Sequence, residues 1–336
     1  MRSFRILTPR DVATAVDQLP ATRGPATRED ARVLAGGQDI LTELKHDLIA
    51  PEALVDLSSI AGLEGHERTP DGGLRIGAMT RLVDLERDAS LAGAFAVLRE
   101  AAASVASPQI RTQATVGGNL CQRPRCAYYR HSHAPCIKKG GSECFAATGH
   151  NKYNAIFGGG PSYIVHPSDL APALVALNAE AVVVGPRGER RMPLENFFTL
   201  PSEGSILREN VLGKNEVLSE LIVPKPADGT VSTYLKFRER ESYDFALVAV
   251  ACTLRIDGSK LASASLVLGG VAPIPWRATR AEVLLANAEV GVDLVRRAAQ
   301  ASIEGAAPLS ENGYKLPLTR NLVWKALTAL GAGGAR

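Results

Sequence analysis

The sequence predicts an α+β fold built from three successive units. In the first unit, residues 1–60, short strands alternate with short helices. In the second, residues 61–222, strands and helices are mixed and a long stretch without periodicity interrupts them. In the third, residues 223–336, strands come first and helices follow, an order typical of a sheet covered by helices on one face.

The composition supports a globular protein with several subdomains. The chain has 336 residues, 46% of them hydrophobic and 22% charged, and a net charge of +3. This size is large for a single core, and the near-balance of charge gives no reason to expect nucleic acid as a partner. No apolar run approaches the roughly 20 residues of a membrane span. Because Asp11 and Asp17 interrupt the N-terminal segment, we expect no signal peptide. We therefore expect either a cytoplasmic protein or a periplasmic one exported with a signal-bearing partner.

Periodicity and turn residues predict the elements in order. In the first unit, Thr8 is expected to cap a helix that follows the first strand. Strands are expected at residues 4–7, 32–35, 53–56, 74–76, 181–184, 231–237, 246–256 and 262–268. Helices are expected at residues 40–45, 82–88, 91–107, 170–177, 277–287, 292–303 and 319–330. Residues 200–230 are rich in proline and glycine and are interpreted as a linker, although residues 217–223 have the pattern of a strand.

The first informative motif is a glycine-rich turn between a strand and a helix. It reads Val33-Leu34-Ala35-Gly36-Gly37-Gln38-Asp39-Ile40. Glycines allow a positive φ and a close approach of a ligand to the backbone, and successive N–H groups then face a phosphate. The motif is not G-x-G-x-x-G, so the nicotinamide-binding pattern is absent. A purely structural turn is the alternative.

Two further segments resemble parts of a dinucleotide site. Ala114-Thr115-Val116-Gly117-Gly118-Asn119-Leu120 again combines two glycines with small hydrogen-bonding side chains. Two such turns suit the two phosphates of a dinucleotide. Downstream, Ser168 or Asp169 is expected to cap a helix, which would by itself explain Asp169. A carboxylate at that position also suits a ribose or ribityl hydroxyl.

Four of the five cysteines lie within 24 residues. They are Cys121, Cys126, Cys136 and Cys144, with the spacing C-x4-C-x9-C-x7-C, whereas Cys252 is expected to be buried in a strand. An odd, clustered set argues against disulfides and for a metal or cluster site. An iron–sulfur cubane is usually held by four thiolates. Zinc ribbons use C-x2-C pairs, and the sequence has no such pair. Structural zinc, with His131, His133 or His150 as additional ligands, and free thiols remain alternatives.

Basic residues surround these cysteines. A thiolate-bound cubane is anionic, so nearby cations are expected to favour it and to lower the pKa values of its thiols. The candidates are Arg123, Arg125, Arg130, Lys138 and Lys139.

The order of the motifs resembles the FAD-binding medium subunit of the xanthine dehydrogenase and molybdenum hydroxylase family. The segments AGGQDIL, RIGAMTRLVDLE, ATVGGNL and SDLAPAL carry the resemblance, which covers nearly the whole chain. It implies a two-part FAD-binding domain (FAD-binding type 2, PCMH-like), with subdomains at 1–60 and 61–222. A C-terminal domain like that of the carbon monoxide dehydrogenase flavoprotein would follow at 223–336.

The resemblance also implies roles for individual residues. The residues expected to contact the FAD pyrophosphate are Val33, Leu34, Ala35, Gly36, Gly37, Gln38, Asp39, Ile40, Thr115, Gly117, Gly118 and Asn119. The aspartate of the S-D-L motif is Asp169. Leu218 is expected near the flavin ring and Lys236 near its edge, with ordinary core and a solvated strand charge as the respective alternatives.

The cysteine-bearing insert at about residues 121–160 narrows the resemblance further. Its segments CQRPRC and KKGGSEC are similar to the cluster-bearing FAD subunits of bacterial periplasmic-type aldehyde oxidoreductases. This implies a 4Fe–4S cluster held by the four clustered cysteines. A similar cluster occurs in the flavin subunit of 4-hydroxybenzoyl-CoA reductases, which is an alternative relative.

The function implied is electron transfer within a heterotrimeric molybdenum-containing aldehyde oxidoreductase. A large subunit with the molybdenum cofactor and a small subunit with 2Fe–2S clusters would supply electrons, and FAD would pass them to an external acceptor. No catalytic residue is expected on this chain, because it has no Ser-His-Asp order, no H-E-x-x-H and no Walker loop. The sequence also leaves open a free-standing flavin oxidoreductase and, from a different class, a zinc-stabilised interaction module.

Overall fold

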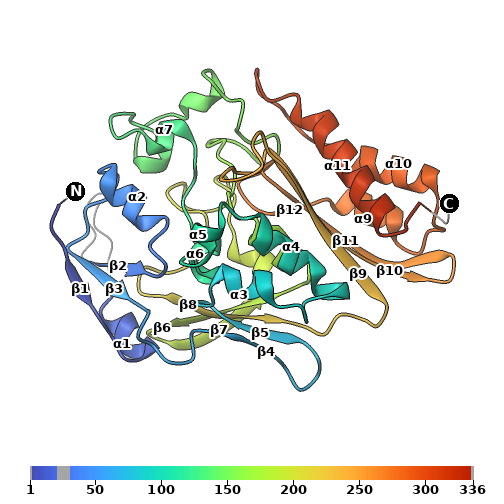
Figure 1. Cartoon of the computed structure of the whole chain (residues 1–336). Helices are drawn as coiled ribbons and strands as arrows, with labels where there is room; N and C mark the ends of the chain where they lie inside the picture. Colours follow the sequence, from blue (N-terminus) through green and yellow to red (C-terminus); the bar gives the residue numbers. More distant parts are fainter. Residues whose placement is uncertain (1, 21–30, 334–336) are drawn as a thin grey trace.

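The computed structural model describes residues 2–20 and 31–333, which form three sheets in sequence order (Figure 1). The first is parallel, with the order β1 (Arg5–Leu7), β3 (Ala53–Asp56), β2 (Ala31–Leu34). Two short helices connect its strands, α1 (Val12–Asp17) and α2 (Ile40–Lys45). The prediction of Thr8 as a helix cap is wrong. The helix starts later because the Asp11 carboxylate accepts the Thr14 N–H at 2.7 Å.

The second sheet is antiparallel and has five strands. Their order is β4 (His66–Arg68), β5 (Leu74–Gly77), β8 (Val217–Val223), β6 (Glu180–Gly185), β7 (Gly188–Pro193). The last of these strands in the sequence, β8, lies at the centre and pairs with both β5 and β6. Because the chain must return to the middle of the sheet, residues 207–223 belong to the body of the protein. The interpretation of residues 207–216 as a linker is therefore wrong, whereas the strand pattern of residues 217–223 is confirmed.

Short helices contribute to a core that this second sheet shares with the C-terminal sheet. They are α3 (Leu82–Arg87), α4 (Ala96–Ser104), α5 (Pro108–Arg111), α6 (Val116–Leu120) and α8 (Leu170–Ala176). The expected single helix over residues 91–107 is wrong. A 3-10 turn, η1 (Gly93–Phe95), comes before α4, and the chain then turns at Ala106 with a φ of 42°. Ser107 caps α5, where the Ser107 Oγ accepts the Ile110 N–H at 3.5 Å.

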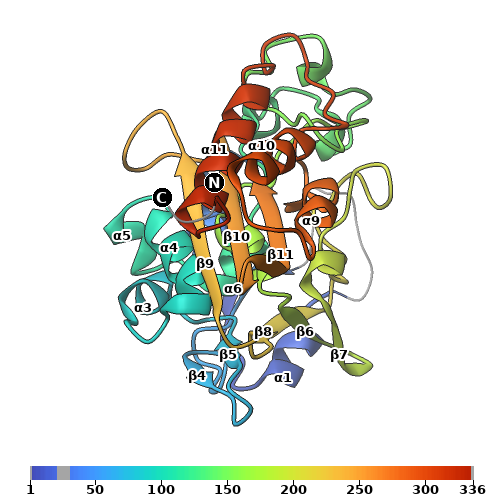
Figure 2. The same cartoon turned by 90° about the vertical axis from the view of Figure 1, so that its right-hand side faces the viewer.

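The third sheet joins the C-terminal part to the rest. Its strands, all antiparallel, are β12 (Trp276–Arg277), β11 (Lys260–Gly269), β10 (Val248–Asp257) and β9 (Thr230–Phe237). The helices α9 (Thr279–Leu285), α10 (Val292–Ala301) and α11 (Lys315–Ala329) cover one face, as expected (Figures 1 and 2).

Strand β10 is buried on both faces. Val248, Val250 and Cys252 point into the core under the C-terminal helices. Ala249 and Ala251 point into the core shared with α4 and α8, where small side chains let the sheet approach closely. The burial of Cys252 is confirmed, since none of its surface is exposed.

The cysteine-rich insert lies between α6 and α8. Only short elements occur in it: α7 (Ala127–Arg130), η2 (Ile137–Lys139) and η3 (Phe145–Ala147). It projects beyond the sheets between α2 and the C-terminal helices (Figure 1). Its end is held by the first residue of α11, because the Lys315 Nζ donates to the carbonyl oxygens of Tyr153 and Asn154 at 3.0 Å each.

Within the part of the chain that the structure describes, no helix is long and apolar enough to cross a membrane.

Candidate functional site

The two glycine-rich turns come together although one follows strand β2 and the other starts helix α6. A Cβ added to Gly36 would lie 2.0 Å from the carbonyl oxygen of Gln113, so only glycine fits where the turns touch. A Cβ on Gly118 would lie 3.9 Å from that of Ala35. Gly37 has a φ of 73°, which favours glycine for a second reason. Two motifs that lie far apart in the sequence thus form one surface in the fold.

The backbone donors of the two turns differ. No hydrogen bond to another described residue uses the N–H groups of residues 36–39, which leaves this turn able to bind an anion. The second turn is in fact the start of helix α6. There Gly117 N–H donates to the Ala78 carbonyl at 2.7 Å, and Gly118 N–H donates to the Thr115 Oγ at 3.1 Å. Its N–H groups are therefore already occupied within the protein.

A cavity of about 890 Å³ opens beside both turns. Its volume lies towards the upper end of the ~300–1,000 Å³ typical of ligand pockets, so it suits a large ligand. All the residues that the sequence indicated for cofactor binding line it, except Leu34 and Lys236. Leu218 lines the cavity and is also a core residue with 5% of its surface exposed.

Sequence reasoning missed several lining residues, and two groups of them stand out. One is the segment 207–214, hidden by the linker interpretation. The other is Tyr243, Asp244 and Phe245, in the loop between β9 and β10. Tyr243 and Phe245 are exposed aromatic side chains, and two aromatic residues in a loop between strands were the available signal.

Asp169 lies at the cavity and at the N-cap position of α8, but its side chain accepts no hydrogen bond from the helix. Its two oxygens accept hydrogen bonds from the Tyr234 hydroxyl at 2.7 Å and from the Lys236 Nζ at 2.8 Å. Ser168 caps α8 instead, where its Oγ accepts the Ala171 N–H at 2.9 Å. Lys236 is buried, so the alternative of a solvated strand charge is wrong. Burial, together with the Asp169 carboxylate, raises the pKa of the Tyr234 hydroxyl.

Three buried or half-buried carboxylates bind the insert to the cavity wall. Asp39 pairs with Arg125 at 2.9 Å and with Arg130 at 2.7 Å. Glu209 pairs with Arg123 at 2.9 Å and with Lys138 at 2.5 Å. The Tyr129 hydroxyl donates to Glu43 at 2.5 Å.

This network corrects the expected role of the basic residues. Four of the five cations that were expected to favour an anionic cluster are paired with Asp39 or Glu209. Lys139 is the exception among them: burial lowers its pKa, while the negative charges of Cys136 and Cys126 act in the opposite direction.

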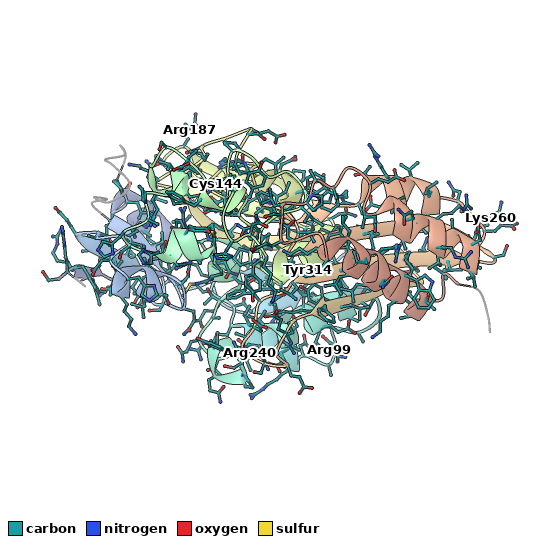
Figure 3. The ribbon with its side chains drawn as sticks, turned by 90° about the horizontal axis from the view of Figure 1, so that it is seen from above. Arg99, Cys144, Arg187, Arg240, Lys260 and Tyr314 are labelled. Atoms are coloured by element: carbon teal, nitrogen blue, oxygen red, sulfur yellow. The ribbon has the colours of Figure 1, made fainter. Side chains whose placement is uncertain are left out.

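The cysteines occupy two different places. Cys121 lines the cavity, whereas Cys126, Cys136 and Cys144 lie in the insert and outside its lining (Cys144 is labelled in Figure 3). Over residues 2–20 and 31–333, no three His, Cys, Asp or Glu side chains converge closely enough to hold one metal ion. His150, with 94% of its side chain exposed, pairs with Glu311 instead.

Comparison with known proteins decides the family. Residues 2–226 match the FAD-binding domain of molybdopterin dehydrogenases, and residues 232–330 match the C-terminal domain of the carbon monoxide dehydrogenase flavoprotein. The chain belongs to this flavoprotein family. It is an FAD-binding subunit of the molybdenum hydroxylases with a role in electron transfer, and its expected α+β fold is confirmed.

The relatives cover the chain from end to end. The FAD-binding subunit PaoB of Escherichia coli aldehyde oxidoreductase is 35% identical over 97% of this chain and 98% of that protein. The medium chain of carbon monoxide dehydrogenase from Hydrogenophaga pseudoflava is 29% identical over 90% of both chains. Among solved structures, reconstituted carbon monoxide dehydrogenase from Oligotropha carboxidovorans aligns with a TM-score of 0.76 at 26% identity, covering 99% of both chains.

The cavity fits the FAD that this family binds. The uncommitted N–H groups of the first turn suit a pyrophosphate, and the volume suits a dinucleotide. The pairing of Asp39 with Arg125 and Arg130 means that this turn faces the ligand mainly with its backbone.

Proposed function

We propose that this chain is the FAD-binding subunit of a molybdenum-containing aldehyde oxidoreductase and that its insert holds a 4Fe–4S cluster. The observation that carries the proposal is the cavity, where two glycine-rich turns meet beneath a cysteine-bearing insert. The similarity to the aldehyde oxidoreductase subunit over nearly the full length of both chains supports the substrate class.

Within the cavity, the chain's own residues position the cofactor. The N–H groups of residues 36–39 bind the pyrophosphate, and Thr115 fixes the second turn beside it. Leu218 provides an apolar wall for the flavin ring. The flavin, when bound, supplies the chemistry of taking up electrons and passing them to an acceptor.

Asp169 and Lys236 act as a pair. Each oxygen of a carboxylate can accept two hydrogen bonds, and each oxygen of Asp169 accepts one from the protein. Asp169 can therefore accept a further hydrogen bond, from a hydroxyl group of the cofactor. Lys236 holds the carboxylate in its orientation from behind the cavity wall.

The expected partners are a molybdenum-cofactor subunit and a small 2Fe–2S subunit. The relatives are named as subunits or medium chains of larger enzymes, and one solved relative is described by its molybdenum cofactor. We propose the same assembly here, with an external electron acceptor at the flavin. Export with a signal-bearing partner or residence in the cytoplasm both fit this assembly.

Purification of the chain from its native host tests the proposal. We expect two co-purifying subunits, FAD and iron in the complex, and reduction of an artificial acceptor that depends on an added aromatic or aliphatic aldehyde. Oxidation of a reduced artificial electron donor that depends on added 4-hydroxybenzoyl-CoA, with no activity towards aldehydes, would replace the enzyme class but leave the subunit role intact. A lone, colourless, zinc-containing chain would overturn the proposal.

A further inference from the structure

The second glycine-rich turn uses the backbone donors of its two glycines within the protein, which leaves its side chains to bind an anion. Asn119 follows the glycines, and its main chain is also held. Its N–H donates to the Thr115 carbonyl at 2.9 Å, and its own carbonyl accepts the Gln122 Nε2 at 2.8 Å. The residue lines the cavity with 8% of its surface exposed. The side-chain amide of Asn119 is therefore the polar group of this turn whose orientation matters for a ligand.

Ser168 fixes one end of this amide. Its hydroxyl oxygen accepts the Ala171 N–H at 2.9 Å, the contact that caps α8. A serine hydroxyl has one proton to donate, and the Asn119 Oδ1 accepts it at 2.5 Å. The Ser168 main chain is held as well, because its N–H donates to the Nδ1 atom of the buried His166 at 3.4 Å. The hydroxyl proton of Ser168 therefore points at the carbonyl end of the Asn119 amide.

The nitrogen end of the amide is left for the cavity. Over residues 2–20 and 31–333, no hydrogen bond uses the Asn119 Nδ2 atom, and the protein does not enclose this atom completely. Because Asn119 lines the cavity, the two N–H donors of its amide open into it. The turn of residues 36–39 lies alongside, since a Cβ on Gly118 would lie 3.9 Å from the Cβ of Ala35. Donors from both glycine-rich turns thus line one wall of the cavity.

We infer that Ser168 is a positioning residue, which holds the Asn119 amide so that its NH2 group, and not its oxygen, faces the FAD pyrophosphate. This inference rests on the FAD site proposed above. With the amide reversed, its oxygen would face the phosphates, and the buried Ser168 hydroxyl would lack an acceptor for its proton. The two polar neighbours of the S-D-L motif then have separate roles. Ser168 orients a donor for the phosphates, and Asp169 accepts from a hydroxyl of the cofactor.

Titration of the flavin-free complex with FAD tests the inference, with ADP as a second ligand that carries the two phosphates without the flavin. Loss of a hydrogen bond to a charged group weakens binding on the order of tenfold to a hundredfold. We expect a loss of this order for both ligands in Asn119→Ala. Asn119→Asp keeps the bond from Ser168 but places a negative oxygen at the phosphates, so it should bind both ligands still more weakly. Wild-type affinity in Asn119→Asp would overturn the orientation of the amide. A loss of FAD affinity with ADP affinity unchanged would overturn the pyrophosphate as its target.

A double-variant cycle separates positioning from helix capping, because Ser168→Ala removes both. Ser168→Ala alone should weaken FAD and ADP binding, by no more than Asn119→Ala does. In Ser168→Ala/Asn119→Ala the affinities should equal those of Asn119→Ala alone, since Ser168 acts through that amide. Ser107→Ala, which removes the capping hydroxyl of α5, is the control and should bind both ligands as the wild type does.

The outcomes distinguish this inference from the function on which it rests. Additive losses in the double variant, or a loss in Ser107→Ala equal to that in Ser168→Ala, would reduce Ser168 to a helix cap. A loss in Asn119→Ala with none in Ser168→Ala would refute the role of Ser168 and leave the FAD site intact. A wild-type complex that binds neither FAD nor ADP would instead contradict the proposed function itself.

Discussion

The two walls of the FAD cavity are held together by different forces. The glycine-rich wall rests on backbone contact: Gly36 lies against Gln113, and Gly117 lies against Ala78. The wall made by the cysteine-rich insert rests on charge, because Glu209 and Asp39 hold it through buried cations. The first wall should therefore be sensitive to added atoms, and the second to lost charges.

The largest effect is expected when Glu209 loses its charge. In Glu209→Gln, Arg123 and the fully buried Lys138 lose their common partner. Breaking a buried ion pair by removing one member typically costs about 3–5 kcal/mol. We expect a fall of this order in the free energy of unfolding, measured by denaturant titration, together with loss of FAD.

Glu203→Gln is the matched control, since this glutamate is exposed and lies shortly before Glu209 in the chain. The double variant Glu209→Gln/Lys138→Met removes one of the stranded charges and should recover part of the loss. Equal stability of the Glu209 and Glu203 variants would show that charge does not hold this wall.

The next effect comes from adding one methyl group to the other wall. In Gly36→Ala, the new Cβ would lie 2.0 Å from a backbone oxygen, so the two turns must separate. Overpacking of this kind costs about 1–3 kcal/mol, and the FAD content should fall with it. Gly313→Ala, where nothing lies within 4 Å of the added atom, serves as the control. Full FAD content in Gly36→Ala would mean that the contact between the turns is not needed for binding.

These two walls also differ in how far the sequence predicts them. The glycine-rich turns are local motifs. Their residues were predicted to bind the cofactor, and nearly all of them line the cavity. It also predicted helix 40–45 with its observed bounds. Glu209 was missed because its partners, Arg123 and Lys138, are 86 and 71 residues away in the sequence, and local composition makes its segment look like a linker.

The same limit applies to the cysteines and to Asp169. Spacing alone groups four cysteines, yet Cys121 belongs to the end of a helix that faces the cavity. A local rule explains Asp169 as a helix cap, but its partners Tyr234 and Lys236 come from the third sheet. Motifs therefore predict the residues of a site, whereas the chain's long-range pairing decides what each side chain contacts.

An effect that depends on pH is expected at His166. This histidine is buried, and burial lowers its pKa from 6.5 to about 4. Because the folded pKa lies below the unfolded value, its contribution to stability is present above pH 6.5 and is lost as the pH falls towards 4. The slope is at most about 1.4 kcal/mol per pH unit. The free energy of unfolding of the wild type should therefore fall relative to that of His166→Gln over this range. A constant difference between the two proteins would exclude His166 as the cause.

The smallest effect is expected at a second glutamate of the segment that carries Glu209. Glu216 makes a two-pronged pair with Arg190, at 2.7 and 3.0 Å, with 38% of the arginine side chain exposed. Water solvates this pair and salt screens it, so Arg190→Met should cost no more than about 1 kcal/mol, and less at high ionic strength. Denaturant titration at low and high salt measures both. If Arg190→Met proved as costly as Glu209→Gln, burial would not explain why charge holds the insert, and the contrast between the two walls would have to rest on geometry alone.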